Sequence, residues 1–390
     1  MSDYLMQTYA RQPVAFERGE GAWLFDTNGE MYLDALAGVA VNGLGHGHPT
    51  LARALCDQAA KLIHTSNLYR IPLQEELAAR LCQLSGLSRA FFCNSGAEAN
   101  EAAIKIARLH GHNNGVDSPA IVVMEKSFHG RTMATLSATG NRKVQAGFEP
   151  LVSGFVRVPF GDSAAVEALA AHHKNIVAVL VEPYQGEGGV QIPQANYLAE
   201  LRRICDEQSW LLMLDEVQTG IARTGTWFAF QHTDVMPDVM TLAKGLGSGV
   251  PIGACLARGV AAETFTPGKH GSTFGGGPLA CTAALTTLSV MESEGLLDHA
   301  AKLGQFIRDD LAMRLQGQAG VVEIRGQGLM IGIQLDRACG DLVKMALEEK
   351  LLINVTNDSV VRLLPPLVMT QADAELLTEK LARLIRIFLG

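Results

Sequence analysis

From residue 90 onward, short apolar runs alternate with longer amphipathic stretches along the chain. The apolar runs are continuous rather than alternating, which is typical of strands covered on both faces of a parallel sheet. Amphipathic stretches over 98–109, 162–172 and 197–208 have the spacing of helices that cross between such strands. The runs expected as strands are 90–93, 120–124, 176–181, 210–214 and 239–242. The pattern predicts a doubly wound α/β domain.

The part of the chain before this region has a different pattern. Two β-prone runs, 23–25 and 31–33, flank an Asn-Gly pair at 28–29, and Asn-Gly favours the tight turn of a β-hairpin. Helical spacing follows over 50–64 and 73–85. We therefore expect an N-terminal hairpin followed by two helices.

After about residue 275 the pattern changes again. Helical spacing over 279–316 leads into shorter runs, and a last helix is expected over 371–388, where Thr370 and Asp373 resemble a capping box. The shorter runs predict strands at 321–325, 329–335, 352–355 and 360–364 and a helix near 340–350. Short strands mixed with helices predict a second α+β unit packed with the N-terminal hairpin.

Length and composition fit this division. The 390 residues suffice for two to three domains, and 48% hydrophobic against 18% charged residues argues against extensive disorder. We expect an N-terminal segment (1–48) packed on the small domain, a large α/β domain that binds the ligand (49–275) and a C-terminal small α+β domain (276–390).

Charge and cysteine content exclude several classes of protein. A net charge of −8 argues against a nucleic-acid partner bound through its phosphates. The sequence lacks an apolar run long enough for a membrane helix, and its first 16 residues lack a secretory signal. The seven cysteines are scattered without CxxC spacing, and the HxH pairs lack further ligands. We expect no metal, no membrane contact and a cytoplasmic location.

Three of the predicted strands end in residues that can carry chemistry. Ser95, Gly96 and Ala97 follow the first strand and open a helix, where unpaired N–H groups can bind an anion or simply receive an ordinary cap. Asp215 ends a fully apolar strand, which suits a ligand-facing carboxylate, a structural ion pair or a metal ligand. Lys244 ends another predicted strand. Its amine is either a buried nucleophile with a lowered pKa or an ordinary lysine whose side chain reaches the surface.

Taken together, these three features indicate one cofactor. Ligands of open α/β sheets collect at the carboxyl ends of the strands, so the three groups are expected to lie close together. Pyridoxal phosphate needs N–H donors for its phosphate, an anion beside its pyridine nitrogen and an amine for its aldehyde. The strand ends therefore predict a pyridoxal-phosphate site.

At this point the chain resembles the class III aminotransferases. The matching segments are 41–49, 94–103, 127–132, 182–190, 214–225, 243–254, 271–276 and 362–367. They follow one another in order along nearly the whole chain. The Phe128-His129 pair and the ending Leu364-Pro365-Pro366-Leu367 most resemble the acetylornithine-type enzymes of this class.

The resemblance implies a fold of type I, a pyridoxal-phosphate cofactor and a role for each matching residue. Lys244 would bind the cofactor covalently and move the proton, and Asp215 would hold the pyridine nitrogen. The remaining cofactor contacts implied are Ser95, Gly96 and Ala97 at the phosphate, Phe128 on the ring face, Gln218 near the phenolic oxygen, and Thr273 from the other subunit. Because Thr273 would come from the other subunit, the resemblance implies a homodimer with a shared active site.

The substrate contacts implied are Arg131 for a carboxylate, Ser272 for the acyl-amino end, and Glu182 as the partner that neutralises Arg362. The reaction implied moves the terminal amino group of an acylated ornithine to 2-oxoglutarate, in arginine biosynthesis. Ornithine, succinylornithine and GABA stay open as amine donors. A cofactor-dependent isomerase or decarboxylase, and a non-catalytic binding protein, stay open as alternatives from other classes.

Overall fold

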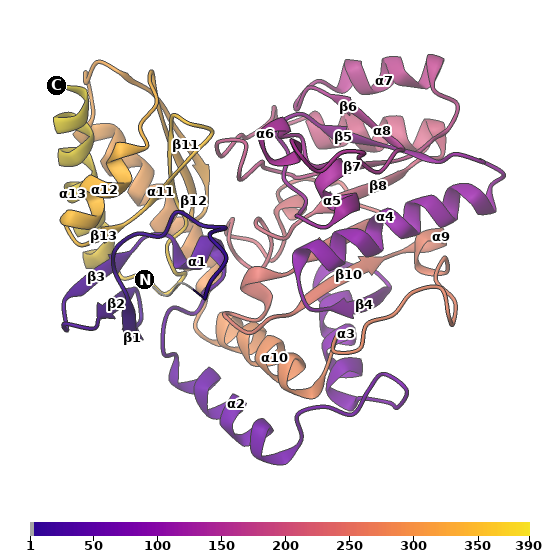
Figure 1. Ribbon diagram of the computed structural model, residues 1–390, viewed down its shortest axis with the longest axis horizontal. Coiled ribbons are helices and arrows are strands. Elements are labelled where there is room, and N and C mark those ends of the chain that lie inside the picture. Colours follow the sequence, from indigo (N-terminus) through magenta and orange to yellow (C-terminus); the bar gives the residue numbers. More distant parts are fainter. Residues whose placement is uncertain (1–3) are drawn as a thin grey trace.

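A seven-stranded sheet runs through the larger part of the molecule (Figure 1). In this computed structural model, which describes residues 4–390, the strand order is β4, β10, β9, β8, β7, β5, β6. The strands are β4 (Arg89–Cys93), β5 (Ala120–Met124), β6 (Phe155–Val158), β7 (Ile176–Val181), β8 (Leu211–Asp215), β9 (Val239–Leu242) and β10 (Gly253–Ala257). β5 to β9 pair in parallel, whereas β10 is antiparallel to both of its neighbours.

Helices cover both faces of this sheet. Every residue of β5, β7 and β8 is buried. Leu212 and Leu214 belong to the apolar cluster that includes helix α8 (Tyr197–Gln208), whereas Met213 belongs to the cluster of helix α4 (Gly96–Asn113). The alternation places the two helices on opposite faces. The predicted doubly wound domain is confirmed.

The second unit contains two four-stranded sheets, drawn in indigo and in orange to yellow in Figure 1. One has the order β1 (Phe16–Glu20), β2 (Trp23–Asp26), β3 (Met31–Asp34), β13 (Leu351–Leu352); the other has β11 (Val321–Gln327), β12 (Met330–Leu335), β15 (Val360–Leu363), β14 (Asn354–Thr356). The predicted hairpin is β2–β3, and β3 pairs with β13 from near the C-terminus. The N-terminal strands therefore share a sheet with a segment 318 residues further along the chain, since Leu33 pairs with Leu351.

The helices of the C-terminal part follow the predicted pattern with one difference. The region expected to be helical over 279–316 is divided at Gly295, whose φ of 64° ends regular helix, into α10 (Pro278–Ser293) and α11 (Leu296–Arg314). α10 packs on the two predicted N-terminal helices, α2 (Pro49–Lys61) and α3 (Pro72–Ser85). The exact domain boundaries stay a prediction.

The other two C-terminal helices are α12 (Asp341–Glu348) and α13 (Gln371–Leu389). The predicted capping box is present at the start of α13, since Thr370 Oγ1 accepts from Asp373 N at 3.1 Å and Asp373 Oδ2 accepts from Thr370 N at 3.2 Å. Among residues 4–390 no helix is long and apolar enough to cross a membrane.

The predicted helix over 162–172 is present as α7 (Ser163–His172). Several short elements were not predicted from the sequence: β1, β6, β10, α1 (Ala37–Ala40), α5 (Met133–Ala138), α6 (Arg142–Gln145), α9 (Gly259–Ala262) and the 3₁₀ turns Ala229–His232 and Lys244–Leu246. Of these, β10 matters most for the site, because it fills the sheet between β4 and β9. The turn after β4 and the turn after β9 are therefore separated by one strand.

The close packing at the start of β10 gives a testable expectation. A methyl group added at Gly253 would lie 2.4 Å from the carbonyl oxygen of Ser95 and 2.8 Å from Cys93 Sγ. Gly253→Ala should therefore lower the free energy of unfolding by about 1–3 kcal/mol, measured by urea denaturation. Gly340→Ala is the matched control, because no atom lies within 4 Å of its added methyl group. Equal stability of the two variants would contradict this packing.

Candidate active site

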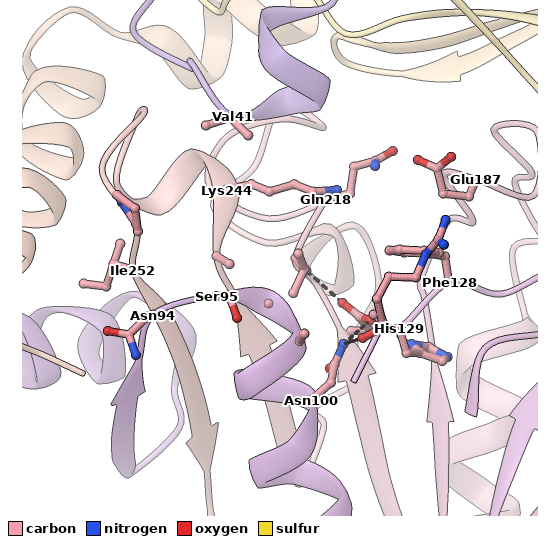
Figure 2. Close-up of a pocket in the computed structure, with 18 of the residues that line it drawn as sticks. Val41, Asn94, Ser95, Asn100, Phe128, His129, Glu187, Gln218, Lys244 and Ile252 are labelled. Carbon is pink, nitrogen blue, oxygen red and sulfur yellow. Dashed lines mark hydrogen bonds and ion pairs between the residues drawn. The ribbon is translucent and has the colours of Figure 1, made fainter. Parts of the chain in front are cut away.

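A cavity of about 420 Å³ opens at the carboxyl edge of the large sheet (Figure 2). Loops after β4, β5, β7, β8 and β9 supply most of its walls. The lining residues are Val41, Asn94, Ser95, Gly96, Ala97, Asn100, Phe128, His129, Gly130, Arg131, Glu182, Glu187, Asp215, Val217, Gln218, Ala243, Lys244, Gly249, Val250, Pro251 and Ile252. All three predicted strand ends therefore meet in one place.

The N-terminus of α4 forms one wall. Ser95 is the N-cap of this helix, and its hydroxyl oxygen accepts from Glu98 N at 3.2 Å. The first N–H groups of a helix have no partner within the helix, so those of Gly96 and Ala97 suit an anion in the cavity. Gly96 also allows close packing, because a Cβ there would lie 2.6 Å from Val217.

Asp215 is buried, and four polar atoms of neighbouring residues lie within 3.5 Å of its carboxylate oxygens. Its Oδ2 accepts from Asn100 Nδ2 at 2.8 Å and lies 2.7 Å from His129 Nδ1. Its Oδ1 accepts from Val217 N at 3.0 Å, with Thr241 Oγ1 at 3.5 Å. These contacts fix the position and orientation of the Asp215 carboxylate in the cavity wall.

Lys244 lies two residues after the end of β9 and adopts a φ of 44°, a strained backbone angle for a residue with a side chain. Its side chain extends across the cavity toward Gln218 (Figure 2). Burial lowers the pKa of the Lys244 ammonium, although the negative charges of Glu187 and Asp215 oppose this effect. A larger fraction of its amine is therefore neutral near physiological pH than in an ordinary lysine.

The expected pairing of Glu182 with Arg362 is wrong. Glu182 lies at the end of β7, where its Oε1 accepts from Phe128 N at 2.9 Å and its Oε2 accepts from Gly186 N at 3.1 Å. Burial raises the pKa of Glu182 to about 7. Two backbone donors already satisfy this carboxylate, so the guanidinium of Arg362 finds its partner elsewhere.

That partner is Glu187, five residues further along the same loop. Arg362 Nη1 lies 2.6 Å from Glu187 Oε1, and it also donates to Gln218 Oε1 at 3.4 Å. Arg362 Nε donates to Asn354 Oδ1 at 3.2 Å. Burial favours the neutral form of Glu187, but the Arg362 charge outweighs it and lowers the pKa of this carboxyl group.

The side chains of Phe128 and Arg131 lie at the rim of the cavity. The Arg131 guanidinium carbon is 5.7 Å from the centre of the Phe128 ring, and Arg131 is exposed to solvent. A guanidinium free at a cavity mouth can bind a carboxylate through two parallel hydrogen bonds.

Ser272 and Thr273 lie outside this cavity. They line a neighbouring hollow of about 520 Å³ together with Asn94, which also lines the main cavity. Ser272 Oγ accepts from Asn94 Nδ2 at 3.3 Å and from Gly275 N at 3.0 Å. The structure of one chain therefore does not bring Thr273 to the cavity that holds Lys244.

Sequence reasoning assigned no role to three residues of this site. His129 and Asn100 bind Asp215, and Glu187 binds Arg362. A signal was available for Asn100, since it is a polar residue on the buried, alanine-rich face of α4. For His129, which is buried beside an apolar strand end, the signal was weaker.

Comparisons with known proteins agree with this geometry. The family model described as "Aminotransferase class-III" matches residues 4–385. An acetylornithine aminotransferase of Nitrosomonas europaea is 64% identical over 386 residues, covering 99% of this chain and 98% of that protein. Acetylornithine aminotransferase 1 of Bordetella pertussis is 54% identical over 390 residues, covering 100% of this chain and 99% of that protein.

Solved structures show the same relationship. The ornithine aminotransferase of Toxoplasma gondii superposes with a TM-score of 0.95 at 36% identity, covering 99% of this chain and 93% of that chain. The acetylornithine aminotransferase of Elizabethkingia anophelis superposes with a TM-score of 0.87 at 34% identity, covering 98% and 96%. The fold of type I that the sequence implied is confirmed, and the chain belongs to the class III aminotransferase family.

Proposed function

We propose that this protein is a pyridoxal-phosphate-dependent aminotransferase that moves the terminal amino group of N-acetylornithine to 2-oxoglutarate. Its products would be N-acetylglutamate semialdehyde and glutamate, in cytoplasmic arginine biosynthesis. The observation that carries the proposal is that Lys244, Asp215 and the start of α4 face one cavity. The names of the most similar relatives favour acetylornithine as the amine donor.

The residues present fit the cofactor. A volume of about 420 Å³ is within the usual range for small-molecule sites. Ser95, Gly96 and Ala97 would hold the phosphate, Asp215 the pyridine nitrogen, and Phe128 one face of the ring, with Gln218 near the phenolic oxygen. Bound there, pyridoxal phosphate would supply the electron sink that transamination requires.

The chain's own residues hold the Asp215 carboxylate in place. Asn100 Nδ2 donates to Asp215 and to the backbone oxygen of His129, both at 2.8 Å, while Asn100 Oδ1 accepts from Thr241 Oγ1 at 2.7 Å. This network spans α4, the loop after β5 and strand β9. It fixes the carboxylate position before any ligand arrives, so little reorganisation is needed when charge develops.

Lys244 would act as the base that removes a proton from the amine donor and as the acid that returns it. Burial lowers the pKa of the Lys244 ammonium, which favours the neutral amine that the base role needs. Val41, Val250, Pro251 and Ile252 add apolar walls to the cavity, which limit the access of water.

Arg131 and Arg362 can distinguish the two substrates by the number of their carboxylates. N-acetylornithine carries one carboxylate, which Arg131 would bind through its exposed guanidinium. 2-Oxoglutarate and glutamate carry two, and the second would bind Arg362 after displacing Glu187. Arg362 is only 1% exposed, whereas the Glu187 side chain is 37% exposed, so Glu187 is the partner with room to move.

Replacing Lys244 tests the proposal most directly. Borohydride treatment of the protein with pyridoxal phosphate should place a mass adduct on the peptide that contains Lys244. Lys244→Ala should lose that adduct and lower the transamination rate by roughly 10²–10⁴-fold or more, because the proton-transfer group is gone. Lys143→Ala is the control, since Lys143 is exposed and forms an ion pair with Asp358 at the surface. An adduct on a different peptide would refute the assignment.

A second expectation concerns the choice between substrates. Glu187→Gln removes the charge that neutralises Arg362, so binding of a dicarboxylate no longer requires displacement of an anion. The ratio of kcat/KM for N-acetylornithine to kcat/KM for glutamate should fall by about tenfold or more. Glu292→Gln, at an exposed ion pair with Arg80, should leave the ratio unchanged. An unaltered ratio in the Glu187 variant would exclude this role.

The active unit we propose is a homodimer. Exposed apolar side chains gather at residues 62–69 and 274, where Leu68 is 87% and Phe274 67% exposed. The two segments are joined, because the rings of His64 and Phe274 lie 5.3 Å apart and Asn67 Nδ2 donates to the carbonyl oxygen of Ser272 at 2.9 Å. Thr273 and Ser272 lie on this surface, which suits residues that complete the site of the other subunit.

Disruption of this surface should therefore affect both assembly and activity. Leu68→Asp places a charge in the apolar surface and should convert the dimer to a monomer in sedimentation velocity, with loss of most transaminase activity. Met313→Asp, at a 66% exposed position on α11, should keep both. A fully active Leu68→Asp monomer would show that the site is complete within one chain.

Ornithine is the second candidate donor, since the structure with a TM-score of 0.95 is named an ornithine aminotransferase. Steady-state comparison of N-acetylornithine, succinylornithine, ornithine and GABA separates these donors. Stoichiometric conversion of 2-oxoglutarate to glutamate separates all of them from an isomerase or a decarboxylase, because neither of those consumes the keto acid.

A further inference from the structure

The loop that carries Glu187 belongs to the large unit and also makes hydrogen bonds to the small unit. It follows β7 of the large sheet and closes on itself through a backbone bridge between Gln185 and Gln191. From the large unit, Glu182 accepts from Gly186 N at 3.1 Å. From the small unit, Thr356 Oγ1 donates to the carbonyl oxygen of Glu187 at 2.6 Å. The loop is therefore held from both sides.

Arg325 on β11 makes two hydrogen bonds to the backbone of this loop. Its Nη2 donates to the carbonyl oxygen of Gly189 at 2.6 Å and its Nε donates to that of Val190 at 2.8 Å. One planar guanidinium thus binds two successive carbonyl groups, a geometry that a lysine ammonium cannot reproduce. Nη1 is paired with Glu323 at 2.7 Å, so the side chain is fixed from the other direction as well.

The loop needs this support, because its conformation is strained. Val190 is fully buried with a φ of 49°, which is unfavourable for a β-branched residue. Its side chain packs on Gly332, the residue paired with Arg325 in the neighbouring strand, where an added Cβ would lie 2.9 Å from that of Val190. Strained backbone of this kind persists only where its surroundings hold it.

We propose that Arg325 is a positioning residue that holds the loop so that Glu187 stays paired with Arg362. In this way Arg325 sets the preference between substrates with one carboxylate and substrates with two. The inference rests on the proposed function. Arg325 touches neither the cavity nor Arg362; it acts through the backbone of Gly189 and Val190. With the anchor loosened, Glu187 leaves Arg362 more easily, and a second carboxylate binds there at lower cost.

The test uses unreactive ligands on the protein loaded with its cofactor. Glutarate carries two carboxylates and pentanoate carries one, and calorimetry gives the Kd of each. Arg325→Lys should bind glutarate about five- to tenfold more tightly than the wild type, because charge-assisted hydrogen bonds to the loop are lost, and should not bind pentanoate more tightly. The kcat/KM ratio of N-acetylornithine to glutamate should fall by a similar factor.

Two further variants test whether a change in glutarate binding is due to the loosened loop. Thr356→Val removes the second small-unit anchor without a change of shape and should move glutarate binding in the same direction, by less. Arg337→Lys, at an exposed pair with Asp336 in the same unit, should leave both ligands unchanged. Unchanged or weaker glutarate binding in both Arg325→Lys and Thr356→Val would overturn the inference.

Failure of the proposed function gives a different result. If the wild-type protein does not transfer amino groups from N-acetylornithine to 2-oxoglutarate, the proposed function is wrong, whatever the Arg325 variant does. If the wild type is active and the variant keeps its glutarate affinity and substrate ratio, only the role of Arg325 is wrong.

Discussion

The buried carboxylate of Asp215 is the constraint around which the carboxyl edge of the large sheet is organised. A carboxylate in such a place needs polar partners, and here they come from α4, from the loop after β5, from β9 and from the turn after β8 itself. Each partner fixes its own element relative to the others. The same contacts that hold the Asp215 carboxylate therefore also shape the cavity.

Much of this arrangement could be predicted from residue patterns. The runs that became β5, β7 and β8 are continuously apolar, and every residue in them is buried. β10 could not be found in this way, because Gly253–Ala257 is short and built mostly of small residues that also suit a loop. Its position depends on pairing with β4 and β9, which are distant along the chain.

Some residues of the site could likewise be predicted from the sequence, and others could not. Asp215 and Lys244 could be singled out, because each is a charged residue at the end of an apolar strand, where burial has an evident cost. The partner of Arg362 could not, since the choice between Glu182 and Glu187 depends on the path of the loop after β7. A carboxylate five residues away reaches the small unit, while the nearer one is used by backbone N–H groups.

The parallel pairing of β3 with β13 has a consequence for synthesis of the chain. The last strand of the large sheet ends at Ala257, so that sheet can be completed while the ribosome is still adding the C-terminal third. The hairpin made first, by contrast, lacks its neighbouring strand until Leu351 and Leu352 have emerged. The hairpin β2–β3, although synthesised early, is thus among the last parts of the molecule to gain all its neighbours.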